Sequence, residues 1–143
     1  MYKRQLYDKE VGYSVELEST REFLRTPNLY GYGTLFFTPN KSFSTSINAV
    51  YTGPMKVLHI AGSPEQLTDE IITSVPFMDL SIKTGYTFLF KKLDFGLELF
   101  GGVKNMLNAY QSAFDTGKNR DSNFIYGPSL PRTFYVGVKL FSL

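Results

Sequence analysis

The sequence lacks the residues on which several common kinds of site depend. It has no Cys and one His among 143 residues, so disulfide frameworks, thiolate zinc sites, cysteine nucleophiles and His-rich metal sites are excluded. It has no Trp either, its net charge is +2, and only 20% of its residues are charged. A nucleic-acid binder that works by bulk positive charge is therefore excluded as well.

Long apolar runs are also absent. No stretch approaches the roughly 18 consecutive apolar residues of a membrane helix, so any crossing of a bilayer would be made by strands. The segment Met1 to Asp8 begins with basic residues but is followed by no apolar run, which is not the pattern of a secretory signal. We therefore expect either a cytoplasmic protein or an internal piece of a longer one.

Aromatic residues, by contrast, are plentiful, with 13 Phe and 10 Tyr in a chain that is only 43% hydrophobic. Apolar residues recur with a period of two, which is typical of strands with one apolar and one polar face. The alternation predicts six strands in a chain whose length fits one domain. They lie over residues 11–18, 30–38, 43–52, 77–90, 93–99 and 133–140.

The apolar faces of these strands carry no charged residue, whereas the opposite faces do. A Lys or Arg on the lipid face of a membrane barrel costs about 2 to 4 kcal/mol at the midplane, so charge-free faces suit lipid. The polar faces would then line an aqueous lumen, and the residues expected there are Ser44, Ser46, Asn48, Asp79, Ser81, Lys83 and Glu98. A half-exposed soluble sheet gives the same alternation, and periodicity alone does not separate the two.

The connections between the predicted strands are alternately long and short. Residues 19–29, 53–76 and 105–131 form the long ones, and residues 38–41 and 91–92 the short ones. Up-and-down outer-membrane barrels have this plan, with short turns at one end and long loops at the other. Together with aromatic residues that suit interfacial girdles, it favours an all-β, antiparallel up-and-down transmembrane β-barrel.

Six strands fall short of the eight in the smallest bacterial outer-membrane barrels, and an open sheet would leave two unpaired edges. One solution is that the chain is the terminal part of a larger barrel. The other is that two further strands lie in the weaker segments Lys3 to Lys9 and Met55 to Ala61 and complete an eight-stranded barrel. The absence of a signal sequence favours the first solution.

Two segments near the C-terminus carry a resemblance to a known family. They are Gly101-Gly102-Val103-Lys104-Asn105-Met106-Leu107-Asn108-Ala109-Tyr110 and Pro131-Arg132-Thr133-Phe134-Tyr135-Val136-Gly137-Val138-Lys139. With shorter pieces at residues 24–28, 51–55, 115–122 and 126–129, they resemble the C-terminal end of TonB-dependent outer-membrane receptors. The resemblance implies a plugged 22-stranded barrel, of which residues 1–143 would be the final six or so strands, with no plug domain. The last residue is Leu143, where that family commonly ends in an aromatic residue.

The resemblance also implies a function and partners. The whole receptor would carry out energised uptake of a scarce solute, such as a ferric siderophore, haem or cobalamin, across the outer membrane of a Gram-negative bacterium. Its partners would be outer-membrane lipid, the remainder of the barrel and plug, a small solute such as a metal chelate, and the energy-transducing TonB complex, reached through the missing N-terminal part. The alternatives are a complete eight-stranded barrel with an adhesion or structural role, and a soluble ligand-binding barrel of lipocalin type.

Few residues suggest chemistry. His59, in the longest connection, is a candidate for contact with a ligand, although a lone His in a loop is more often solvated. Asp94 and Glu98 are four residues apart, about 13 Å along a strand, which is too far for paired acid–base work on one bond. No nucleophile, base and orienting residue can be assembled, so we expect no catalytic residue, no metal site, no cofactor and no enzyme activity.

Overall fold

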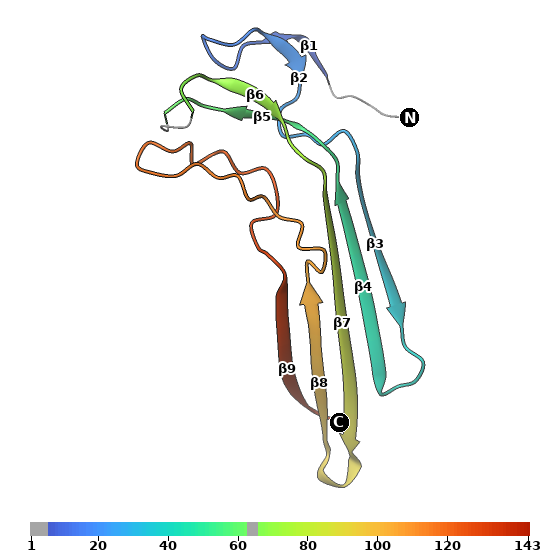
Figure 1. The fold of residues 1–143 in the computed structure, drawn as a ribbon. Helices are drawn as coiled ribbons and strands as arrows, with labels where there is room; N and C mark the ends of the chain where they lie inside the picture. Colours follow the sequence, from blue (N-terminus) through green and yellow to red (C-terminus); the bar gives the residue numbers. More distant parts are fainter. Residues whose placement is uncertain (1–5, 63–65) are drawn as a thin grey trace. The chain divides into compact units, whose positions relative to one another are not determined.

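A computed structural model describes residues 6–62 and 66–143. Its regular structure is strands, with one short 3-10 turn, η1 (Lys91–Leu93), in the part of the chain described. The strands form one sheet of five and two sheets of two (Figure 1). The prediction of an all-β, antiparallel chain is therefore confirmed.

The large sheet contains five of the six predicted strands. In their order across the sheet they are β3 (Tyr30–Phe37), β4 (Phe43–Thr52), β7 (Phe77–Phe90), β8 (Phe95–Lys104) and β9 (Thr133–Ser142). Their directions alternate, and the two tight turns, between β3 and β4 and between β7 and β8, lie at one end of the sheet (Figure 1). We call this the tight-turn end. The long connections leave from the opposite end, as the alternating lengths predicted.

The remaining strands form two separate hairpins. β1 (Leu6–Val11) pairs with β2 (Thr20–Glu22), and β5 (Lys56–His59) pairs with β6 (Glu70–Thr73). Of the two weaker segments, Met55 to Ala61 does contain a strand, whereas Lys3 to Lys9 overlaps β1 and lies partly outside the described residues. Neither β1 nor β5 joins the large sheet, so they do not supply a seventh and an eighth strand to it.

The strand predicted over residues 11–18 is wrong. After Val11 the chain bends and turns back towards β2, and Val15 is fully exposed. The turn is held by local bonds, because the Ser14 carbonyl accepts the N–H of Leu17 and the Ser14 hydroxyl accepts the N–H of Glu16. Serine side chains that bond nearby backbone compete with strand pairing, and the apolar alternation alone did not reveal this.

The chain divides into two units. The sheet unit comprises residues 31–50, 78–109 and 130–143, and the loop unit comprises the described residues of 1–30, 51–77 and 110–129. Among the residues described, the buried hydrophobic side chains are Val57, Phe77 and Phe124, and all three belong to the loop unit. The described part of the sheet unit thus has no buried hydrophobic side chain, although it carries most of the apolar alternation.

The register of the sheet fixes which residues share a face. Glu98 of β8 lies opposite Thr87 of β7 and opposite Lys139 of β9, while Leu97 lies opposite Leu140. Residues directly opposite one another point to the same side. The charged residues therefore line up across these three strands on one face, and the apolar residues line up on the other.

Hydrogen bonds of threonine hydroxyls show which residues of β3 and β4 lie on each of the two faces. The hydroxyls of Thr45 and Thr84 are 3.1 Å apart, which places Thr45 on the apolar face. Thr34 donates to Oδ1 of Asn48 at 2.9 Å, which places Thr34 on the charged face. This settles the orientation of β3, whose sequence has aromatic residues on both sides.

Candidate lipid-facing surface and loop cluster

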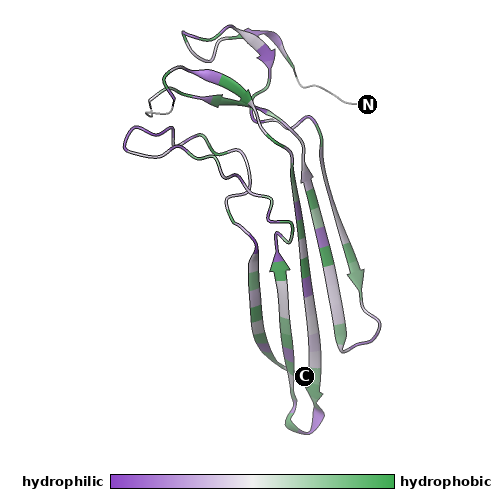
Figure 2. Cartoon of the chain, in the orientation of Figure 1, coloured by the Kyte–Doolittle hydropathy of each residue, from purple (hydrophilic) through white to green (hydrophobic). Residues whose placement is uncertain are grey.

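One face of the large sheet has no charged residue, and we call it the charge-free face. Its largest side chains are Leu35, Phe37, Phe43, Ile47, Tyr51, Met78, Leu80, Ile82, Tyr86, Phe88, Phe90, Phe95, Leu97, Leu99, Val103, Phe134, Val136, Val138 and Leu140. The alternation appears as bands of green and paler colour along β4 and β9 (Figure 2). Val136 is 86% exposed and Phe134 72%. An exposed apolar surface of this extent marks a place where a protein or a lipid binds.

Aromatic side chains gather at both ends of the charge-free face. Beside the tight turns lie Phe37, Phe43, Phe88, Phe90 and Phe95, and at the other end lie Tyr51 and Phe134. The rings of Phe90 and Phe95 stack with their centroids 4.7 Å apart. Between the two aromatic borders the face is largely aliphatic. Transmembrane β-barrels place aromatic girdles at the two interfaces in this way.

The opposite face, which we call the charged face, holds all seven residues predicted to line a lumen. They are Ser44, Ser46, Asn48, Asp79, Ser81, Lys83 and Glu98. Ser44 and Glu98 both lie close to Gly85, and the hydroxyl of Ser81 donates to Asp79 at 2.9 Å. The strand register and these contacts place the seven residues on one face, and their position in a lumen stays a prediction.

Three aromatic rings of the charged face lie over glycines of the neighbouring strand. The pairs are Phe141 over Gly96, Phe100 over Gly137 and Tyr135 over Gly102. A Lys ammonium lies near each ring, with nitrogen-to-centroid distances of 5.6 Å for Lys139 and Phe141, 4.5 Å for Lys83 and Phe100, and 5.8 Å for Lys104 and Tyr135. A Cβ at any of these glycines would overlap the ring, so each pair depends on glycine and holds β8 against β9.

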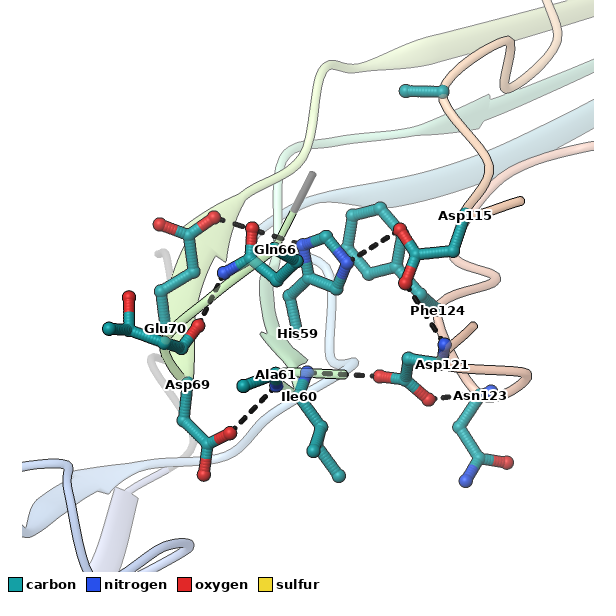
Figure 3. Close-up of polar contacts among 12 residues, drawn as sticks. His59, Ile60, Ala61, Gln66, Asp69, Glu70, Asp115, Asp121, Asn123 and Phe124 are labelled. Atoms are coloured by element: carbon teal, nitrogen blue, oxygen red, sulfur yellow. Dashed lines mark hydrogen bonds and ion pairs between the residues drawn. The ribbon is translucent and has the colours of Figure 1, made fainter. Parts of the chain in front are cut away.

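His59 lies at the centre of a cluster of contacts in the loop unit and is 8% exposed (Figure 3). Its ring stacks on Phe124 with centroids 3.7 Å apart and an interplanar angle of 10°. Nε2 lies 2.8 Å from Oδ1 of Asp115, and Nδ1 lies 3.8 Å from Oε1 of Glu70. His59 is therefore a packed residue rather than a solvated loop residue, and contact with a ligand stays a prediction.

Two carboxylates tie the long connection between β8 and β9 to the end of β5. Asp115 accepts the N–H of Asp121 at 3.0 Å. This bond is the main reason that the pKa of Asp115 lies below its ordinary value of 3.8; burial raises the pKa, and the bond to His59 lowers it further. Asp121 accepts the N–H of Ile60 at 3.1 Å. Within residues 6–62 and 66–143, no three His, Asp or Glu side chains are placed to hold one metal ion.

Gln111 is 2% exposed and uses every hydrogen-bonding group of its side chain. Nε2 donates to the carbonyls of Ala113 and Phe124, and Oε1 accepts the N–H groups of Tyr126 and Gly127. A buried amide that is fully satisfied fixes both arms of the long connection. Sequence reasoning missed Gln111, because nothing in the local pattern distinguishes a buried glutamine from an exposed one.

No helix in the described part of the chain is long and apolar enough to span a bilayer. Comparison with known proteins finds no matching protein family, no matching curated protein and no matching solved structure.

Proposed function

We propose that this chain is the C-terminal part of the barrel of a TonB-dependent outer-membrane receptor. The observation that carries the proposal is the charge-free face, which is apolar, is bordered by aromatic residues and has no buried side chain among its described hydrophobic residues. A soluble sheet buries its apolar face under a second layer of structure. Lipid would cover this face without a second layer, and the charged face would then meet the water and the plug inside the barrel.

The number of strands favours a large barrel over a small one. A closed up-and-down barrel of bacterial type has an even number of antiparallel strands, so a five-stranded sheet needs an odd number of further strands. Among the residues described, β3 and β9 each have one hydrogen-bonded neighbour in the large sheet, while β1 pairs with β2 and β5 pairs with β6. Adding those four would leave the total odd. The rest of a larger receptor supplies the missing strands more simply than a complete eight-stranded barrel with an adhesion or structural role.

The long connections are suited to the solute side of such a receptor. His59, Asp115 and Gln111 hold the loop unit in a defined arrangement, and a loop ordered before binding loses less entropy when its ligand arrives. The proposed solute is a scarce nutrient of the ferric siderophore, haem or cobalamin type. Transport would also need the plug and the energy-transducing TonB complex, which engages the receptor through its N-terminal part.

Cell fractionation tests the proposal. The full-length protein, produced in a Gram-negative host, should sediment with outer membranes and require detergent for extraction. Recovery of a compact, water-soluble monomer from the cytosol would contradict the membrane assignment. If that monomer bound an apolar dye within its cavity, the lipocalin-type alternative would be supported instead.

A further inference from the structure

Positive charge lies just beyond the aromatic border at the tight-turn end. The turn between β7 and β8 carries Lys91 and Lys92, both exposed, and Leu93 beside them is 70% exposed. One carboxylate, Asp94, belongs to the same turn. A lysine at the edge of an apolar surface lays its methylene stem along that surface and extends its ammonium into the polar layer.

A hollow of about 400 Å³ opens beside this turn. It is lined by Asp94, Phe95, Leu140, Phe141 and Ser142. Phe95 and Leu140 belong to the charge-free face and Phe141 to the charged face, so the hollow lies at the end of the sheet, where the turn begins. An apolar hollow whose lining begins just after the turn residues Lys91 and Lys92 suits a molecule with apolar chains and an anionic head.

Lys41 in the other tight turn is placed differently. It borders a groove of about 430 Å³ whose lining includes Thr38, Ser44 and Thr87, and Ser44 and Thr87 belong to the charged face. Phe43 of the charge-free face also lines this groove, so Lys41 borders residues of both faces. Lys91 and Lys92 come just before the lining residues Asp94 and Phe95 in the chain, and Lys139, on the charged face, lies 5.6 Å from the ring centroid of Phe141.

We propose that Lys91 and Lys92 bind the phosphate of an anionic phospholipid whose acyl chains begin in the hollow formed by Phe95 and Leu140. The inference rests on the membrane location proposed above and adds the class of lipid and the residues that select it. A lysine near an anionic bilayer surface strengthens binding about fivefold. The pair should therefore contribute roughly 25-fold, reduced in part by Asp94.

The test measures how the full chain partitions into phosphatidylcholine vesicles with and without phosphatidylglycerol at one ionic strength. The wild type should enter both kinds of vesicle and bind more tightly where phosphatidylglycerol is present. Lys91→Gln with Lys92→Gln should lose most of that gain, whereas Lys56→Gln with Lys118→Gln, the same charge change within the loop unit, should keep it. Lys91→Arg with Lys92→Arg should retain the gain, because the charge is preserved.

The outcomes separate this inference from the proposed function. Insertion into both kinds of vesicle with no gain from phosphatidylglycerol, or an equal loss in both double Gln variants, would overturn the lipid site and leave the membrane proposal standing. Failure to enter any vesicle would contradict both. Displacement by inorganic phosphate at constant ionic strength would show a free-phosphate site and overturn the assignment to lipid.

Discussion

Leu99→Lys is the substitution that best separates a lipid-facing sheet from a water-facing one. Leu99 lies on the charge-free face opposite Tyr86 and Val138, four residues along β8 from Phe95 in the aromatic border. At a rise of 3.3 Å per residue this is about 13 Å along the strand, or about 10 Å along the bilayer normal for a tilt of roughly 40°. The apolar band of a barrel is about 25 Å tall, so Leu99 falls close to its midplane.

A lipid-facing sheet and a water-facing sheet predict different losses of folding free energy for Leu99→Lys. A lysine at the midplane of the lipid face costs about 2 to 4 kcal/mol of folding free energy. Leu99 is 44% exposed, so the same change on a sheet facing water should alter stability by no more than about 0.5 kcal/mol. Leu97→Lys should cost less than Leu99→Lys, because Leu97 lies opposite Phe88 in the aromatic border.

Thr87→Lys is the matched control, because it adds the same side chain at nearly the same depth on the charged face. Thr87 lies opposite Glu98, whose carboxylate favours a lysine across the strand pair. Ser81→Lys, further along the same face, should also be mild. The measurement is the free energy of unfolding from urea titration of each variant folded in lipid vesicles. Equal unfolding midpoints for Leu99→Lys and Thr87→Lys would refute the assignment of the two faces.

Three further predictions concern the glycine packing between the strands of the sheet, the contacts of His59 in the loop unit, and the pH dependence of the loop unit. Gly102→Ala should cost about 1 to 3 kcal/mol, because its Cβ would overlap the Ile82 carbonyl, whereas Gly33→Ala meets nothing and should leave the urea midpoint nearly unchanged; equal effects would contradict the packing. His59→Ala should speed hydrogen exchange at the Asp121 and Tyr126 amides by up to about tenfold through loss of stacking worth roughly 0.5 to 1.5 kcal/mol, with further loss from the Asp115 bond, and His59→Phe should restore only the stacking part. Because the pKa of Asp115 lies below 3.8, its ionised form stabilises the loop unit above that pH, and the contribution is lost as the pH falls through the lowered pKa. Asp115→Asn should therefore weaken the dependence of hydrogen exchange in the loop unit on pH between about 5 and 3. The part due to Asp69, whose pKa is lowered by its bonds to Ser14 and Ala61, should remain. An exchange profile that is unchanged in Asp115→Asn would contradict this.

The strands of the large sheet were predictable because their two faces differ so strongly in composition. The segments predicted at 43–52 and 77–90 coincide with β4 and β7, where apolar and polar residues alternate over ten residues or more. The pattern failed over 11–18, where Ser14 closes a local turn. A short alternating run does not outweigh a side chain that bonds its own backbone.

The features that shape the candidate sites depend on partners that are remote in sequence. Phe141 covers Gly96 only because β8 and β9 pair in one particular register, and that register is not written in either strand alone. His59 looked like a solvated loop residue, but Asp115 and Phe124, which bury it, come from the long connection between β8 and β9. The alternation along the sequence predicted the two faces, whereas the packing of aromatic rings over glycines and the burial of His59 depend on tertiary pairing.

The order of residue types along the strands favours lipid over protein as the proposed cover of the charge-free face. A second protein layer needs apolar surface throughout the contact, with no preference for aromatic residues at the two ends. Here aromatic residues border a middle that is largely aliphatic apart from Tyr86, and Lys91 and Lys92 follow beyond the border at one end. A bilayer has the same sequence of layers along its normal, from hydrocarbon through the interface to charged headgroups. The strands therefore match a solvent whose polarity changes along their length, which a packed protein layer does not provide.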